Sequence, residues 1–309
     1  MSGLGDRREF LRLLVGGAAG LSFGRRVRAQ TLHQIGVIPL AGNLRLVSGA
    51  GGNVVVLNGP DGVLLVNGGA ADRSAALLEA LAVGTGGKRI EILFNTDWHP
   101  DHTGSNGAVR TRGARIVAHE YAKQYMSTEV YVDWQNRRYA PLPAIALPNQ
   151  TFYTSGTLQF GDEHVQYGHL GQAHTDSDIY VFFADSNVLV AGHALAVDRY
   201  PICDYTTGGW IGGLLTATRT MLELTNAKTQ IVAGSGPVQT RAGLQAQLDM
   251  LTAVRERLIK MMRSGMSADE MLAAGATKEF DAKWGDPTLF VRTNYRGMWL
   301  HVRELGGII

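Results

Sequence analysis

The sequence predicts an α+β domain in which two β-sheets pack between outer helices. After residue 30, short runs rich in β-branched residues alternate with turns, while several longer segments have helical composition. This part of the sequence contains no internal repeat and no linker, and a chain of 309 residues can bury a substantial core. One domain that mixes sheets and helices is therefore the simplest interpretation.

The first half of the domain is expected to begin with a β-hairpin. Residues 53–57 and 62–66 are β-rich runs, and the turn residues Gly59-Pro60-Asp61-Gly62 separate them. The next expected elements are a helix over 74–82, strands over 89–94 and 115–118, and a helix over 121–128. Pro141 and Pro143 predict that the segment 137–144 is an irregular loop.

The second half is expected to alternate strands with long helices. The expected strands cover 157–160, 165–168, 179–184, 188–191 and 230–232. The expected helices cover 210–224 and 242–264, and the last forty residues are mostly helical in composition.

The N-terminus has the features of a cleavable export signal. A charged start at residues 6–12 precedes an apolar run at 13–23, and Val27-Arg28-Ala29 resembles a cleavage boundary. The apolar run is about half of the ~20 residues that a membrane-spanning helix needs. Arg7-Arg8 followed by Phe10-Leu11 resembles the twin-arginine signal, which implies a folded passage through the twin-arginine export machinery. We therefore expect residues 1–29 to be a signal peptide and residues 30–309 to be a periplasmic or secreted domain without a stable membrane anchor.

Charge and cysteine content exclude several classes of protein. The formal net charge of +2 contains a contribution of +4 from residues 1–29, so the expected mature domain carries about −2. This balance shows no footprint for nucleic acid, which would require clustered Lys and Arg. The single cysteine, Cys203, excludes an internal disulfide and a cysteine-rich zinc module.

The segment that follows the expected strand 89–94 carries the densest chemical information. Four potential metal ligands occur within six residues, namely Asp97, His99, Asp101 and His102. Pro100 favours extended backbone at His99, where side chains two residues apart point to the same side. Two imidazoles and two carboxylates this close together repel and desolvate one another unless a cation binds them. A metal site is therefore a better interpretation than a solvated polar turn.

Three further segments place polar residues after expected strands. The run from Gly168 to Asp178 contributes His174 as a candidate ligand, and Asp176 and Asp178 could orient it or its neighbours. The strand at 188–191 ends in Gly192-His193, and the strand at 230–232 ends in a glycine-rich turn. Loops that follow strands are where a sheet-based scaffold places its functional groups.

The order and spacing of these four segments resemble the metallo-β-lactamase superfamily. The family pattern runs His-x-His-x-Asp-His, then Gly-x-x-His-Thr-x-Gly-Asp, then Gly-Asp after a strand, and then Gly-His-Gly-Pro. The runs at 51–54 and 61–66 match the usual opening of the family, so the resemblance covers about residues 40–240. It implies a four-layer αββα sandwich with a two-metal site on one edge, where the metals activate a bridging water for hydrolysis.

The resemblance also shows where the ligand set departs from the family. The positions that match are His99, Asp101, His102 and His174. Asp97 takes the place of the first histidine, and His193 replaces the bridging aspartate, so the number of carboxylate ligands is unchanged. Both residue types ligate zinc, iron and manganese.

Two further departures remove a ligand or a charge. Ser235 replaces the last histidine, and a neutral hydroxyl is a poor ligand. Asn67 stands where the family usually has an aspartate near the metals.

The resulting hypothesis places one metal on Asp97, His99 and His174. A second, weaker metal is expected on Asp101, His102 and His193. One or two zinc ions are expected, and iron or manganese would also suit these ligands. Bound water of lowered pKa would attack a carbonyl or phosphoryl centre, with Asp101 as base if the second metal is absent.

The leading functional hypothesis is an exported metal-dependent hydrolase. Its small-molecule substrate would be an ester, lactone, amide or phosphoester. One alternative is a metal-binding member of the fold that no longer hydrolyses anything, because Ser235 and Asn67 depart from the family's site. Another is a di-iron oxidoreductase-like protein, although the relatives of this kind carry a flavin-binding partner domain that has no counterpart here.

Overall fold

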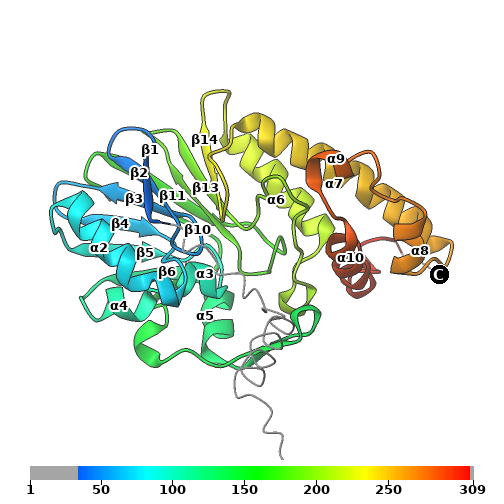
Figure 1. Cartoon of the computed structure of the whole chain (residues 1–309), viewed down its shortest axis with the longest axis horizontal. Coiled ribbons are helices and arrows are strands. Elements are labelled where there is room, and N and C mark those ends of the chain that lie inside the picture. Colours follow the sequence, from blue (N-terminus) through cyan, green and yellow to red (C-terminus); the bar gives the residue numbers. More distant parts are fainter. Residues whose placement is uncertain (1–33, 307–309) are drawn as a thin grey trace, which may run out of the picture. The chain divides into compact units, whose positions relative to one another are not determined.

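Two β-sheets face each other at the centre of the fold (Figure 1). The computed structural model describes residues 34–306, so the predicted signal peptide lies outside the described residues. The first sheet has the strand order β1 (Gly36–Pro39), β2 (Leu44–Ser48), β3 (Val54–Asn58), β4 (Val63–Val66), β5 (Ile90–Phe94), β6 (Arg115–His119) and β9 (Gln150–Phe152). The second sheet has the order β10 (Ser155–Phe160), β11 (Glu163–His169), β12 (Ile179–Phe183), β13 (Val188–Gly192) and β14 (Gln230–Ala233).

Helices cover the outer face of each sheet. Helix α2 (Ser74–Thr85) buries Leu77 and Leu81 against the first sheet. The second sheet is covered by α6 (Ile211–Leu224), α7 (Arg241–Arg263) and α10 (Thr288–Leu300). The shorter helices are α3 (Pro100–Thr103), α4 (Asn106–Arg110), α5 (Glu120–Ser127), α8 (Ala268–Ala273) and α9 (Asp281–Trp284), with 3-10 turns η1 (Ala71–Arg73), η2 (Asp133–Gln135), η3 (Ala144–Ala146) and η4 (Tyr205–Thr207). The arrangement is the four-layer αββα sandwich that the sequence predicted.

The core between the sheets explains why β-branched runs form these strands. Val55, Leu64 and Phe94 of the first sheet pack against Val165 and Val181 of the second, and all five side chains are fully buried. Burial of one such side chain stabilises the fold by about 1.5–3 kcal/mol. The strands are buried on both faces because helices cover the outer sides, which explains their nearly continuous apolar runs.

Strand direction brings the polar loops to one edge of the sandwich. Strand β5 is parallel to β4 and β6, and β13 is parallel to β14. Because the carboxyl ends of parallel strands lie at one edge of a sheet, the loops after β5, β13 and β14 emerge there. Gly234, in the loop after β14, donates its backbone N–H to the carbonyl of Gly192 at the end of β13, at 2.7 Å.

The predicted loop at 137–144 is wrong in its first part. Arg137–Tyr139 forms strand β8, which pairs antiparallel with β7 (Val130–Val132). Pro141 and Pro143 follow this strand, so they do not remove a hydrogen bond from the pair. Strands β1, β2, β7 and β9 were also not expected from the sequence.

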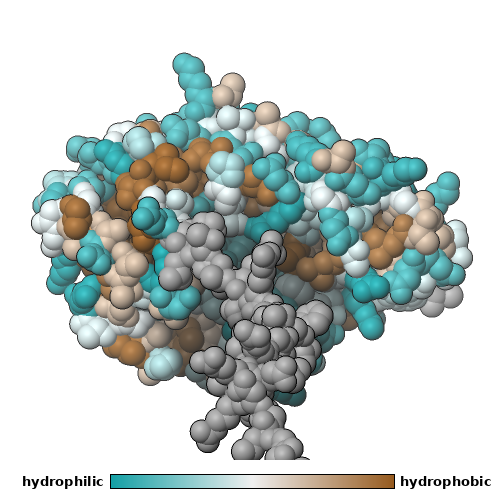
Figure 2. All heavy atoms as spheres, viewed as in Figure 1, coloured by the Kyte–Doolittle hydropathy of each residue, from teal (hydrophilic) through white to brown (hydrophobic). Residues whose placement is uncertain are grey.

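The molecular surface on the face in Figure 2 is mostly polar. Hydrophobic residues gather in the region where Figure 1 places β1 and β2. Strand β1 is at the edge of its sheet and leaves Val37 and Ile38 exposed. None of the helices in residues 34–306 combines the length and the apolar character that a membrane span needs.

His119 makes the stability of the fold sensitive to acid. The residue caps α5, because its Nδ1 accepts the Tyr121 N–H at 3.2 Å while its Nε2 donates to the Tyr153 carbonyl at 3.1 Å. Its ring stacks on His169 at 3.8 Å. Burial and the neighbouring His169 lower the pKa of His119 from 6.5 to about 4.

We expect wild-type protein to lose about 2 kcal/mol more stability than His119→Asn between pH 7.5 and pH 5. Above pH 6.5, which is the pKa of histidine in the unfolded chain, the His119 ring is neutral in both the folded and the unfolded state. Between pH 6.5 and about 4 only the unfolded chain takes up a proton, so the free energy of unfolding falls. Asparagine keeps an N-cap acceptor without this titration. Denaturant unfolding of both proteins at the two pH values measures the difference, and equal pH dependence would contradict it.

Candidate metal centre

The loop after β5 is held in shape by buried hydrogen bonds. Asn95 donates from Nδ2 to the His102 carbonyl at 3.2 Å and exchanges side-chain hydrogen bonds with Asn106. His99 has extended backbone (φ −63°, ψ 147°), and α3 begins at Pro100, as the proline predicted. This geometry turns His102 inward, where its side chain is completely buried.

The carboxylate of Asp97 accepts hydrogen bonds at the centre of the loop that follows β5. Its Oδ1 accepts the His99 backbone N–H at 2.9 Å. Its Oδ2 lies 2.7 Å from His102 Nδ1 and 3.0 Å from His193 Nδ1. Burial by itself raises the pKa of Asp97, but the charges of His102 and His193 outweigh burial and hold that pKa well below its ordinary value. The fully buried carboxylate is therefore ionised.

His193 links the two carboxylates of the cluster. Its Nδ1 faces Asp97 Oδ2, and its Nε2 faces Asp101 Oδ2 at 3.1 Å. Burial lowers the pKa of His193, but Asp101 and Asp97 outweigh burial and raise it well above the ordinary value. Without a metal, both ring nitrogens therefore donate a proton, and the imidazolium neutralises part of the carboxylate charge.

His174 is oriented for a metal by the backbone. Its Nδ1 donates to the Ile202 carbonyl at 2.7 Å, which leaves Nε2 as the nitrogen with a free lone pair. Burial, together with His99 and His193, holds the pKa of His174 well below its ordinary value, so the ring is neutral. Asp178 accepts the Thr175 N–H at 2.8 Å and shapes the loop next to His174.

The structure brings all six predicted ligand residues to one edge but groups them differently from the prediction. The donor atoms of His99, His174 and His193 lie within 4.8 Å of one another. Those of Asp97, His102 and His193 form a second such group. Asp97 was expected with His99 and His174, but its second oxygen turns toward His102 and His193. His193 is shared by both groups, and Asp101 contacts the cluster through it.

The buried nitrogen atoms fit a metal ion. His99, His102 and His174 each have a buried Nε2 without a hydrogen-bond partner, and His99 Nδ1 also lacks one. A buried polar atom without a partner costs about 1–3 kcal/mol. Imidazole nitrogen is a donor that zinc accepts, and metal ions in the two groups would satisfy these lone pairs.

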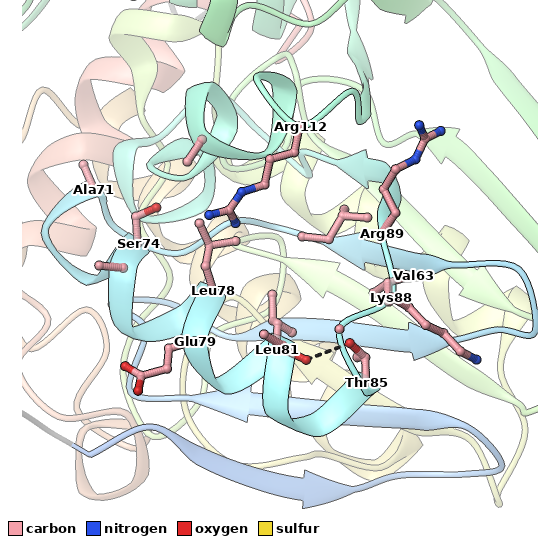
Figure 3. A pocket seen from close by; sticks show the side chains of 15 residues that line it. Val63, Ala71, Ser74, Leu78, Glu79, Leu81, Thr85, Lys88, Arg89 and Arg112 are labelled. Carbon is pink, nitrogen blue, oxygen red and sulfur yellow. Dashed lines mark hydrogen bonds between the residues drawn. The ribbon is translucent and has the colours of Figure 1, made fainter.

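A cavity of about 220 Å³ opens onto this cluster. His99, Asp101, His174 and His193 line it, and Trp134, Arg199 and Ser235 form other parts of its wall. A larger depression of about 920 Å³ lies beside α2 and is lined by Ser74, Leu78, Glu79 and Arg112 among others (Figure 3). No histidine lines the larger depression, so the small cavity is the candidate active site.

Asp204, which the sequence did not reveal as a site residue, supports the wall of this cavity. Its buried carboxylate accepts hydrogen bonds from Trp134 Nε1 at 2.9 Å, from the Thr206 N–H at 3.1 Å and from the Thr207 hydroxyl at 2.9 Å. Its backbone N–H donates to the His174 carbonyl at 2.7 Å. Trp134 is 70 residues away in sequence, so no local motif could have revealed this contact.

Asp204→Ala should destabilise the metal-free protein by about 3 kcal/mol, because several buried donors lose their acceptor. Asp204→Asn keeps one oxygen for Trp134 and Thr206 and should cost about 1 kcal/mol. Denaturant unfolding of the three proteins measures this order. Equal stability of wild type and Asp204→Ala would show that the hydrogen bonds contribute nothing net.

The two departures from the family pattern have distinct surroundings. Asn67 has a left-handed backbone (φ 67°), and its Oδ1 accepts the Thr96 N–H at 2.9 Å. Its buried Nδ2 has no hydrogen-bond partner among residues 34–306.

Ser235 accepts a hydrogen bond from Arg199 Nη2. Cys203 is a fully buried free thiol.

The αββα sandwich gathers at one edge a set of histidine and aspartate donors that could hold a metal ion. A family model described as "Metallo-beta-lactamase superfamily" matches residues 47–239, and the chain belongs to this superfamily. Its members are typically metal-dependent hydrolases.

Solved structures share the fold at low sequence identity. A metallo-beta-lactamase from Pontibacter korlensis is 17% identical (TM-score 0.58), and the match covers 71% of this chain and 99% of that one. The DIM-1 metallo-beta-lactamase is 15% identical (TM-score 0.57), with coverages of 71% and 98%. The stereoselective inverting sec-alkylsulfatase Pisa1 from Pseudomonas sp. is 15% identical (TM-score 0.66), and the match covers 85% of this chain but 50% of that one.

Proposed function

We propose that this protein is an exported metal-dependent hydrolase that acts on a small ester, lactone, amide or phosphoester. The observation that carries the proposal is the convergence of His99, His174 and His193 at the floor of a cavity. Two of these rings have buried ring nitrogens without partners, and the tautomer of His174 leaves Nε2 available. Membership of the superfamily supports the same class of reaction.

The residues of the cavity have separate tasks in this proposal. A bound zinc, iron or manganese ion would supply a water of lowered pKa and a positive charge that polarises the substrate. His99, His174 and His193 would hold that ion. Asp101 lies within the cavity wall with 36% of its side chain exposed, and it contacts His193.

Asp101 is the proposed base if the second metal is absent. Burial raises its pKa, but His193 and His102 outweigh burial and hold the pKa well below its ordinary value, so the carboxylate is ionised. An ionised, partly exposed carboxylate at the cavity can orient a water and accept its proton.

Export is proposed from residues 1–29. Arg7-Arg8 and the boundary at Val27-Arg28-Ala29 support passage through the twin-arginine machinery and a periplasmic or secreted mature protein. This route transports folded proteins, which would allow the metal to bind in the cytoplasm. Mass spectrometry of the exported protein should find Gln30 at its N-terminus.

Metal analysis and a substrate panel test the proposed activity. Protein purified without chelator should contain at least one zinc, iron or manganese ion per chain. It should hydrolyse at least one member of a panel of lactams, lactones, thioesters and phosphodiesters, and chelation should abolish that activity. Bound metal without any hydrolysis would favour the non-hydrolytic alternative, and no metal under any loading condition would overturn both.

A further inference from the structure

A third cavity lies against the loop that carries the candidate metal ligands. It measures about 270 Å³, and the loop contributes Trp98, Pro100, Thr103 and Gly104 to its wall. The rest of the wall comes from η1, α4, α5 and the segment that runs from β8 to η3. Among the described residues, none lines both this cavity and the one that opens onto the metal ligands. It is therefore a separate site, and we call it the apolar cavity.

The wall of the apolar cavity offers nothing to a charged ligand. No Asp, Glu, Lys, Arg or His is among the described residues that line it. Four wall residues have a side-chain N–H or O–H group, and each already donates its hydrogen to an acceptor of the protein: Trp98, Thr103, Tyr125 and Tyr139. An ion that entered would lose its hydration without gaining a partner, whereas an apolar molecule gains free energy by leaving water. The wall thus selects an uncharged, apolar ligand.

The size and the side chains of the apolar cavity favour an aromatic ligand. Trp98 forms part of the wall, and its ring centroid lies 5.8 Å from that of Tyr125 and 5.3 Å from that of Tyr139. Such a group of rings favours a further ring in edge or offset-stacked contact, and Met126 adds an adaptable side chain. An apolar cavity of about 150 Å³ is large enough for benzene, so this one has room for one or two fused rings.

One layer of side chains separates the apolar cavity from the candidate metal centre. Trp98 stacks on His99 with 4.5 Å between the ring centroids, and Pro100 follows His99 in the chain. Tyr139 donates a hydrogen bond to Gln135, and Gln135 lines the cavity of the metal centre. A molecule in the apolar cavity therefore contacts the same side chains that hold His99 in place.

We propose that the apolar cavity binds an uncharged molecule of one or two aromatic rings and that its occupant strengthens metal binding at His99. The occupant packs against Trp98 and Pro100 and restrains the loop, so a metal that binds afterwards removes less conformational freedom. Linkage requires that bound metal strengthens binding of the aromatic molecule by the same factor. The binding site does not depend on the proposed hydrolysis, because the metal-free fold already forms it.

Calorimetry with toluene tests the binding site in metal-free protein. Toluene should bind with a Kd below about 1 mM, as expected for a small apolar ligand that fits its cavity. Benzoate and benzylammonium have a similar shape and carry a charge, so they should displace toluene at least about tenfold less effectively. Equal displacement by the charged molecules would overturn the apolar class of ligand, and no binding of toluene up to its solubility limit would overturn the site.

A variant that fills the cavity locates the bound toluene. Ala140 is exposed and lines the apolar cavity, so Ala140→Phe should occupy part of it without loss of the fold and raise the Kd of toluene at least about tenfold. Ala82→Phe adds the same side chain at another exposed alanine, in the depression beside α2, and should bind toluene as wild type does. Equal toluene affinity in wild type and Ala140→Phe would show that toluene binds elsewhere.

Zinc titration tests the coupling between the two sites. Competition with a zinc chelator should give a zinc affinity about fivefold higher with toluene bound than without it in wild type and Ala82→Phe. Toluene should leave the zinc affinity of Ala140→Phe unchanged. Equal zinc affinity of wild type with and without toluene would overturn the coupling. A protein that binds toluene but no metal would overturn both the hydrolase proposal and the coupling, while the binding site stands.

Discussion

Replacing His193 by alanine should abolish both the proposed metal binding and the proposed hydrolysis. His193 belongs to both groups of potential ligands, so its loss leaves two donors in each. Loss of an outer-shell partner typically costs 10–100-fold in metal affinity, and loss of a shared ligand should cost at least about 100-fold. The metal content of His193→Ala after dialysis, measured by mass spectrometry, should fall close to zero.

The same substitution should also destabilise the metal-free protein. His193 donates to Asp97 and Asp101, and Asp97 is completely buried. Removal of one partner from a buried ion pair costs about 3–5 kcal/mol, because the remaining charge is left uncompensated. Denaturant unfolding in the presence of chelator measures this cost separately from metal binding.

His164→Ala provides the matched control. His164 is exposed and pairs with Asp185 at 2.9 Å on the surface, where such a pair contributes little to stability. This variant should retain its metal and its activity. Normal metal content in His193→Ala would contradict the assignment of His193 as a ligand.

A single methyl group at Gly234 should disable the site while leaving the fold intact. A Cβ at this position would lie 2.8 Å from His193 Cδ2 and 2.9 Å from His102 Nε2. These rings stack at 4.0 Å and His102 is completely buried, so neither can move without cost. Overpacking of this kind costs about 1–3 kcal/mol, and a ring displaced from its donor position weakens metal binding.

Gly234→Ala should therefore lower metal affinity by about 100-fold, an effect similar to the loss of a supporting residue. Competition with a zinc chelator measures this affinity, and circular dichroism should show unchanged secondary structure.

Gly84→Ala is the matched glycine control for this experiment. Gly84 lies in helix α2, and a Cβ there would meet nothing within 4 Å. The exchange should stabilise the protein by about 0.5–1 kcal/mol, because alanine is the better helix former, and it should leave metal binding unchanged. Wild-type metal affinity in Gly234→Ala would show that the two rings are not held where a metal needs them.

The sequence predicted the fold, because strand patterns, turns and the family resemblance are all readable from it, while its choice of metal ligands stays a prediction. The apolar runs at 53–57 and 62–66 with Gly59-Pro60-Asp61-Gly62 between them form the hairpin β3–β4. Pro100 fixes the extended backbone of His99 and the start of α3. Strand β8 was missed because its three residues precede two prolines and carry no long apolar run.

What the sequence determined by itself was the αββα class, through its strand patterns and its family resemblance, and the presence of six histidine and aspartate residues in loops that follow strands. Strand patterns, turns and ligand-rich loops are properties of neighbouring residues, so they can be recognised without the tertiary structure.

Only the tertiary structure decided how those residues combine. Asp97 meets His193 across 96 positions of sequence, and Arg199 meets Ser235 across 36. These contacts depend on how two sheets pack and on which way each side chain turns within the packed edge. Local sequence does not encode either choice, and for this reason the grouping of the potential ligands emerged only from the fold.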